Sequence, residues 1–172
     1  QGEVGVACSM AAGALAANAV ARAAPDGYTL MVGVAASIAV APHVFKSAAY
    51  DPTKAFVPIG LIQRSPYFIT ARHDVPFSNF AGMLDYARKN PGKLNFGTPG
   101  IATLHHLTWE LLQQKTGVSM THIPMQAPQM VTETLAGRID LFMDSATSLT
   151  TSNVKAGKFK FIAMSGEKRM AA

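Results

Sequence analysis

A glycine-rich turn bordered by hydroxyl side chains is the part of this sequence best suited to chemistry. A short apolar run ends at Gly97 and is followed by Thr98, Gly100 and Thr103. An amphipathic helical pattern begins directly after them. This spacing predicts a strand, a tight turn and a helix N-terminus. Unpaired amides and the positive end of the helix dipole favour an anion there, and the threonine hydroxyls can donate to it. We therefore predict a carboxylate or phosphate site at Thr98, Thr103 and the amides around Gly100 to Ala102.

The spacing excludes two familiar phosphate loops and leaves one plainer alternative open. A Walker-type loop requires Gly-Lys-Ser/Thr at the start of the helix, whereas Ala102 and Thr103 stand there without a lysine. Gly97 and Gly100 supply only part of the dinucleotide-binding pattern. The plainer alternative is an ordinary strand-to-helix turn whose glycines serve backbone geometry alone.

Composition places the chain among globular proteins. Of its 172 residues 49% are hydrophobic and 15% charged, which excludes a disordered chain. The alanine-rich stretch 10–24 contains Asn18 and Arg22, so it predicts a helix of a globular protein rather than a membrane span. The single Cys8 excludes an internal disulfide and a paired-cysteine metal site. The net charge of +5 is diffuse, which suits small anions but does not support nucleic-acid binding. We expect neither a metal nor a cofactor.

Strand-like and helix-like segments alternate through the second half of the chain. A glycine follows each helical pattern, as expected where helices end. This alternation predicts an α/β fold in which a parallel sheet is covered by helices. In such sheets ligands bind beyond the carboxyl ends of the strands, where loops 98–103, 124–126 and 144–147 should meet. The predicted strands are 94–97, 119–123, 139–143 and 159–164, and the predicted helices are 104–116, 129–136 and 146–156.

Asp144 directly follows an apolar run, so it should stand at a strand end and face the ligand. Its alternative role is the N-cap of the next helix, and one residue can serve both purposes. The histidines His105, His106 and His122 suggest a metal site or a general base. However, adjacent histidines on one helix point about 100° apart, which disfavours a shared ion. There is also no Gly-x-Ser-x-Gly nucleophile motif. We therefore expect packing histidines, no catalytic residue and no enzyme.

The first half of the chain is less regular. It predicts a helix over 11–23, a strand over 28–32 and a strand-to-helix loop over 33–37. The β-rich segment 59–71 contains Pro66, which suggests an edge strand or a crossing between two lobes. We place the lobe boundary there.

Short motifs along residues 10–169 resemble, in their order and spacing, the substrate-binding proteins of tripartite tricarboxylate transporters, the TctC or Bug family of bacterial periplasmic receptors. The motifs are Ala-Pro-Asp-Gly-Tyr-Thr-Leu from Ala24, Tyr-Asp-Pro from Tyr50, Phe-Val-Pro from Phe56, Asn-Pro-Gly-Lys-Leu-Asn-Phe-Gly from Asn90, Thr103 with His106, Leu-Ala-Gly from Leu135 and Lys-Ala-Gly-Lys from Lys155.

The resemblance implies a two-lobed α/β periplasmic binding protein of type II, a Venus flytrap that captures a small carboxylate. It divides the chain into a partial first lobe (1–66), a nearly complete second lobe with a βαβ parallel sheet (67–165) and the start of a return to the first lobe (166–172). It implies periplasmic localisation and membrane transporter subunits as partners. The ligand-binding residues that it implies are Val34, Ala35, Ser37, Gly97, Thr98, Gly100, Ala102, Thr103 and Asp144.

Departures from the family pattern bear on the ligand. In the first-lobe loop Val34, Ala35 and Ala36 leave only Ser37 polar, which favours a monocarboxylate, or a dicarboxylate with an apolar or aromatic body. Both ends are short relative to the family, which suggests a fragment, a degenerate product, or a chain completed by a homo-oligomer or a strand swap. Two other functions stay open: a remnant or sensory binding module without a transport role, and a small α/β hydrolase or transferase.

Overall fold

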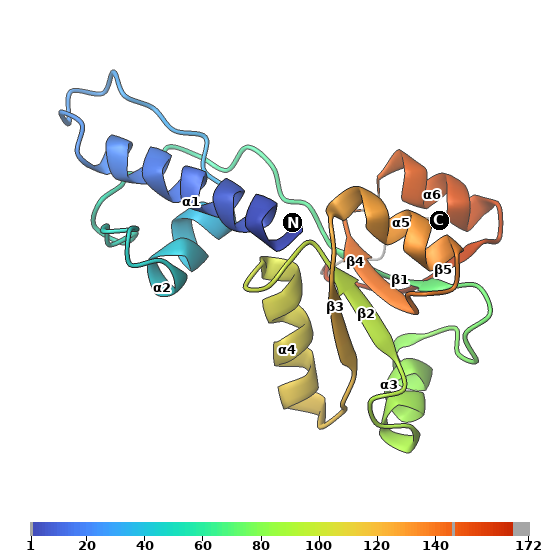
Figure 1. The fold of residues 1–172 in the computed structure, drawn as a ribbon. Helices are drawn as coiled ribbons and strands as arrows, with labels where there is room; N and C mark the ends of the chain where they lie inside the picture. The colour runs from blue at the N-terminus through green and yellow to red at the C-terminus, as the bar shows by residue number, and fades with distance from the viewer. Residues whose placement is uncertain (1, 146, 167–172) are drawn as a thin grey trace. The chain divides into compact units, whose positions relative to one another are not determined.

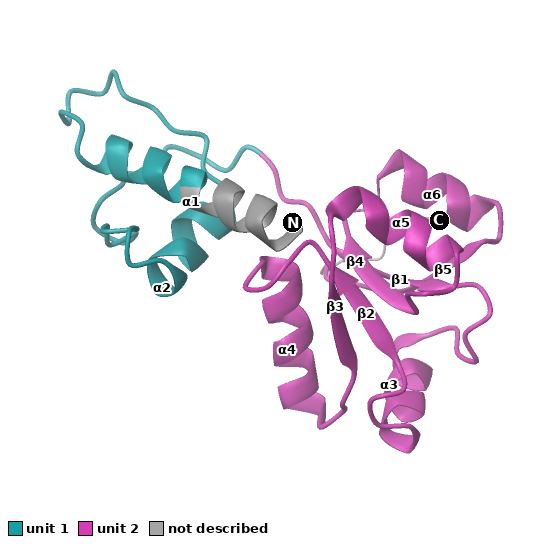
Figure 2. Ribbon diagram, viewed as in Figure 1, with its two compact units in different colours: residues 1–62 teal, residues 63–172 magenta. Residues whose placement is uncertain are grey.

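The computed structural model describes residues 2–145 and 147–166, and side chains from residue 12 onward. The chain forms two compact units, Gln1–Ile62 and Gln63–Ala172 (Figure 2). Each unit is described by itself. The expected return of 166–172 to a first lobe lies, apart from residue 166, outside the described residues.

The second unit is built on a five-stranded mixed sheet. Its strands are β1 (Phe68–Arg72), β2 (Asn95–Thr98), β3 (Thr121–Pro124), β4 (Leu141–Asp144) and β5 (Phe159–Met164). They lie side by side in the order β3-β2-β4-β1-β5 (Figure 1). β2 pairs in parallel with β3 and β4, whereas β1 is antiparallel to both β4 and β5.

The direction of β1 corrects the expected all-parallel sheet. The four predicted strands share one direction, but β1 runs against them in the interior of the sheet. The β-rich segment 59–71 is a strand only from Phe68, so Pro66 lies outside the hydrogen-bonded ladder. Residues 68–71 are buried, as expected for a strand covered on both faces. The expected edge strand is therefore an inner one.

Four helices cover the two faces of this sheet: α3 (Phe80–Lys89), α4 (Leu104–Thr116), α5 (Ala127–Leu135) and α6 (Ser148–Lys155). Leu141 and Met143 join α3 and α4 in one cluster, where Phe96 stacks on Trp109 at 5.0 Å between ring centroids. Phe142 points the other way and joins α5 and α6. This alternation along β4 follows from the two-residue period of a strand and separates the helices onto opposite faces (Figure 1).

The helix ends follow the local signals in the sequence. Thr103 caps α4, because its hydroxyl accepts from the His106 amide, and Asn79 caps α3 by accepting from Gly82. Gly117 ends α4 in the left-handed region, with φ of 69°, where a side chain would be strained. The predicted end of this helix at a glycine is confirmed.

The first unit is a small helical assembly. It contains α1 (Gly2–Ala21), a π-helical turn η1 (Ala36–Val40) and α2 (Ala41–Val44). Its core is a cluster of small side chains around Tyr50, whose hydroxyl donates to the Ser37 carbonyl. Helix α1 confirms the predicted helix over 11–23 and begins earlier. Among the described helices, none combines the length and the apolarity needed to cross a membrane.

The predicted strand over 28–32 is wrong. These residues have no regular structure, and Tyr28, Leu30 and Val32 are 92%, 70% and 80% exposed. A strand forms only where its amides and carbonyls find a partner, and no described segment pairs with this one. The β-forming side chains are present, but the backbone ladder that would use them is missing.

Candidate functional site

The predicted anion loop joins β2 to α4, as Figure 1 shows. Thr98 is the last residue of β2 and is fully buried. Between this threonine and the N-cap of α4 the backbone twice takes a positive φ, 141° at Gly100 and 61° at Ala102. Ala102 is the one described residue other than glycine with a positive φ, which costs a residue with a side chain about 1–2 kcal/mol. Interactions around the loop must offset this cost.

Both threonine hydroxyls are used inside the loop. Thr103 Oγ1 donates to the Gly100 carbonyl at 2.8 Å and accepts from the His106 amide at 3.3 Å. Thr98 Oγ1 lies 3.2 Å from the same carbonyl and accepts from the Gly100 amide at 3.3 Å. We expected these hydroxyls to donate directly to a ligand. In the structure they hold the loop in shape, with Gly100 at the centre.

The loop leaves backbone donors available instead. Within the described part of the chain, the amides of Ile101, Leu104 and His105 have no hydrogen-bond acceptor. They belong to the loop and to the first turn of α4, where the helix dipole is positive. Water or an anionic group can satisfy them, and a carboxylate is a suitable acceptor.

Asp144 stands at the carboxyl end of β4, next to the carboxyl end of the parallel strand β2. Its carboxylate accepts from the Ser145 amide at 2.7 Å and from the Thr150 hydroxyl at 3.2 Å. The alternative N-cap role is wrong, because Thr147 caps α6. Burial lowers the pKa of the His105 ring, and the Asp144 carboxylate opposes that effect. Asp144 therefore lies near the first turn of α4.

The loop after β3 adjoins the same edge of the sheet. The Met125 amide donates to the Thr98 carbonyl at 3.0 Å. The Met125 thioether lies close to Gly97, where an added Cβ would meet the sulfur at 3.6 Å. This is ordinary van der Waals distance, so the Met125 side chain packs beside β2 at Gly97. The loops after β2, β3 and β4 follow three neighbouring parallel strands, as the rule for α/β sheets requires.

The other three predicted residues belong to the first unit. The Val34 carbonyl accepts from the Ser37 amide and hydroxyl, both at 3.1 Å, so this turn uses the serine hydroxyl internally. Ser37 is 9% exposed, Val34 is 63% exposed, and Ala35 precedes the π-helical turn η1. The structure thus gathers Gly97, Thr98, Gly100, Ala102, Thr103 and Asp144 in the second unit, and Val34, Ala35 and Ser37 in the first.

Two histidines support the loop in a way that the sequence did not indicate. His106 Nδ1 accepts from the Ala102 amide at 3.2 Å, and His122 Nε2 lies 2.6 Å from Thr98 Oγ1. The two rings lie against each other with centroids 4.2 Å apart. Burial, and then the neighbouring His106, lower the pKa of His122 to about 4. Neither contact has a clear signal in the sequence, because one depends on the positive φ of Ala102 and the other on the register of β3 with β2.

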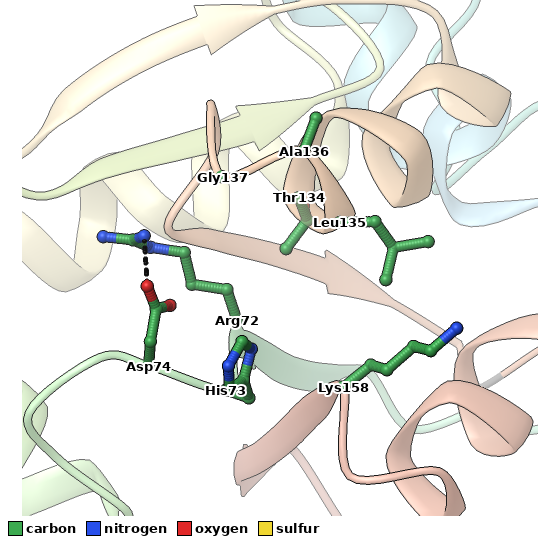
Figure 3. Close-up of a pocket in the computed structure, with 8 residues that line it drawn as sticks. All are labelled: Arg72, His73, Asp74, Thr134, Leu135, Ala136, Gly137 and Lys158. Carbon is green, nitrogen blue, oxygen red and sulfur yellow. Dashed lines mark hydrogen bonds and ion pairs between the residues drawn. The ribbon is translucent and has the colours of Figure 1, made fainter.

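Neither a metal nor a second anion site emerges elsewhere in the described residues. No group of three metal-ligating side chains is found among them. A pocket of about 380 Å³ lies near the amino ends of β4 and β5 and is lined by Arg72, His73, Asp74, Thr134–Gly137 and Lys158 (Figure 3). Arg72 is already paired there with Asp74 at 2.8 Å and with Asp140 at 2.9 Å.

Known proteins are similar to this chain in both sequence and fold. A UPF0065 protein of Bordetella pertussis is 33% identical over 159 residues, which cover 92% of this chain and 49% of that protein. A UPF0065 protein of Agrobacterium vitis, encoded in the TAR-I ttuE-ttuC' intergenic region, is 36% identical over 93% of this chain and 46% of its own length. The chain thus spans about half the length of these relatives.

Solved structures agree. The match to a structure described as a periplasmic transporter covers 91% of this chain and 53% of that structure's chain, with 31% identity and a TM-score of 0.72. The periplasmic binding protein BugD covers 91% of this chain and 52% of its own, with 33% identity and a TM-score of 0.68. The match to an R. palustris protein solved with adipate covers 91% of this chain and 52% of that protein's chain, with 29% identity and a TM-score of 0.69. The expected α/β periplasmic binding protein fold is confirmed.

The family model described as the tripartite tricarboxylate transporter family receptor matches residues 6–172. Since this match spans nearly the whole sequence, the chain belongs to that family of solute-binding receptors.

Proposed function

We propose that this chain contributes to a periplasmic receptor that binds a small organic carboxylate at the loop between β2 and α4. The observation that carries the proposal is the group of amides without a hydrogen-bond acceptor at Ile101, Leu104 and His105. A carboxylate placed there satisfies donors that the protein itself does not use, and it benefits from the helix dipole.

The other predicted residues have supporting roles in this proposal. Thr98 and Thr103 shape the loop through the Gly100 carbonyl. Asp144 keeps unused lone pairs beyond its two bonds, so it accepts from a ligand hydroxyl or from a bridging water. Val34, Ala35 and Ser37 of the first unit are proposed as further ligand-binding residues, and their mostly apolar composition favours a ligand with an apolar or aromatic body.

The relatives support the class of ligand. One structural neighbour was solved with adipate and another, MatC from Rhodopseudomonas palustris, with bound malate. Periplasmic localisation and delivery to membrane transporter subunits are proposed for this chain because it belongs to the family. A remnant module predicts no carboxylate binding, and a hydrolase or transferase predicts turnover of a bound ester or carboxylate.

Replacing Thr103 by valine tests the proposal. The hydroxyl joins the Gly100 carbonyl to the His106 amide, so its loss should loosen the loop and weaken adipate binding by about 1–3 kcal/mol. Isothermal titration calorimetry measures this change, and T103S should restore binding because it keeps the hydroxyl.

The matched control is T116V. Thr116 Oγ1 donates to the Leu112 carbonyl at 2.7 Å at the far end of the same helix. This variant should keep the wild-type affinity. Equal affinity in T103V and T116V would count against the assignment of the loop, and the absence of binding to adipate, malate and benzoate would favour the remnant module.

A further inference from the structure

The contact between Ala102 and His106 fixes the protonation state of the histidine ring. A backbone amide can only donate, so Nδ1 must carry a lone pair for the 3.2 Å contact to be a hydrogen bond. The proton of the neutral ring then lies on Nε2, which is 3.5 Å from a carboxylate oxygen of Glu110. Both ring nitrogens are thus used by neighbours suited to a single tautomer.

This bond acts on the most strained point of the loop. Ala102 holds a φ of 61°, a conformation that costs a residue with a side chain more than it costs glycine. The amides of Ile101 and Thr103 flank it in sequence, so the direction of both donors depends on the conformation of Ala102. The His106 amide also donates to the hydroxyl of Thr103, three residues earlier in the chain. One residue therefore supports the loop through its backbone and through its ring.

We propose that His106, in its neutral form, is a positioning residue for the carboxylate-binding loop, and that protonation of Nδ1 releases Ala102 and weakens carboxylate binding. The effect on binding rests on the function proposed above, whereas the effect on the loop does not. A protonated Nδ1 is a donor facing another donor, so the contact turns from attractive to repulsive.

The groups around the ring define what happens on acidification. Among the described residues, the titratable groups that face His106 are Glu110 on its own helix and His122 from β3. Burial, and then the neighbouring His106, lower the pKa of His122 to about 4, so the His122 ring is protonated only at the acid end of a titration. His105, one residue earlier on α4, contacts Tyr67 instead.

The direction in which carboxylate affinity changes in acid distinguishes two explanations. A positive ring beside the loop would attract a carboxylate, so simple charge attraction predicts tighter binding in acid. Loss of the Ala102 bond predicts the opposite. We expect adipate affinity to fall about fivefold when the His106 ring becomes protonated, the scale of one lost hydrogen bond.

Nuclear magnetic resonance of the wild-type chain provides the first test and needs no ligand. The ring ¹⁵N shifts should show Nδ1 unprotonated and Nε2 protonated at pH 8. The Ala102 amide shift should then follow the His106 ring as the pH is lowered to 5. A proton on Nδ1 at pH 8, or an Ala102 amide that ignores the ring titration, would overturn the proposal. Failure of adipate to bind would overturn the proposed function and leave this readout intact.

Asparagine at position 106 provides the second test, because its side-chain oxygen can take the place of Nδ1 without titrating. H106N should bind adipate with an affinity that no longer changes between pH 8 and pH 5. The matched control H73N removes an exposed ring near the amino ends of β4 and β5 and should keep the wild-type pH dependence. The proposal fails if H106N retains the pH dependence or if H73N abolishes it.

Discussion

At the scale of single residues, His122 shows how burial of a histidine ring makes the stability of the folded state sensitive to acid. Its ring stacks on Phe96 at 5.1 Å, lies against His106 and contacts the Thr98 hydroxyl. This environment lowers its pKa to about 4, with burial as the largest cause. In the unfolded chain the ring has a pKa of about 6.5. The unfolded state therefore binds more protons between these two values.

The sign of the effect on stability follows from that difference. The contribution of His122 is fully present above pH 6.5 and is lost as the pH falls toward 4. Because the ring is partly exposed, we expect a loss of about 2 kcal/mol in the free energy of unfolding across this range. Urea denaturation at pH 7 and pH 4.5 measures it. H122Q should show a smaller loss, and the exposed-site control H73Q should behave as wild type. An equal loss in H122Q would assign the acid sensitivity to other groups, such as His105.

At the scale of elements, one carboxylate joins three strands. Asp140, directly before β4, accepts from Arg72 Nε of β1 at 2.9 Å and from the Asn95 amide of β2 at 3.0 Å. The Asp140 amide donates back to the Asn95 side chain at 2.8 Å. This nearly buried group thus connects the two strands that flank β4.

D140N should lower the free energy of unfolding by about 2–3 kcal/mol, because it removes a charge that two donors share in a largely buried place. Chemical denaturation followed by circular dichroism measures the change. The control D85N breaks an exposed pair with Arg88 within one helix and should cost less than about 0.5 kcal/mol. If the two variants lost the same stability, Asp140 would not connect the strands energetically.

Helices α1, α4, α5 and α6 and four of the strands could be predicted because their signals are local, whereas α3 was not predicted. Thr103 and Gly117 mark the ends of α4 through contacts within a few residues, and glycines end α5 and α6 in the same way. The direction of β1 could not be predicted, because an apolar run is compatible with either direction and its partners lie far along the chain. The loop between β2 and α4 was predictable from Gly97 and Gly100. The support from His106 could not be predicted, because it depends on a positive φ at Ala102, and only a glycine at that position would have indicated such a conformation.

At the scale of the whole molecule, the two units differ in how completely their backbones are paired. In the first unit, residues 28–34 and 57–62 include exposed apolar side chains in segments without regular structure. In the second unit, β4 is paired on both sides and buried in the sheet. An apolar segment with free backbone groups has few interactions to protect it from solvent.

Hydrogen exchange should therefore be much faster over residues 28–32 than over β4. Mass spectrometry of deuterated peptides at several protein concentrations, with light scattering on the same samples, measures this. Protection of 28–32 that rises with concentration would mean that a second copy covers the segment. Equal, strong protection of both regions in a monomeric sample would show that the segment is paired within the chain, contrary to the structure.

The position of β1 has a consequence for the time course of folding. Its neighbours in the sheet are residues 141–144 and 159–164, so both arrive late in synthesis. The segments from β2 to β4 can form parallel units with their connecting helices as they emerge, while Phe68–Arg72 waits with both edges open. The gap between β4 and β5 closes only when the chain reaches Met164. Such distant pairings make folding slow for a domain of this size, because a long loop must be ordered before the contacts repay it. We therefore expect the sheet of this unit to be completed only when β1 pairs with both β4 and β5.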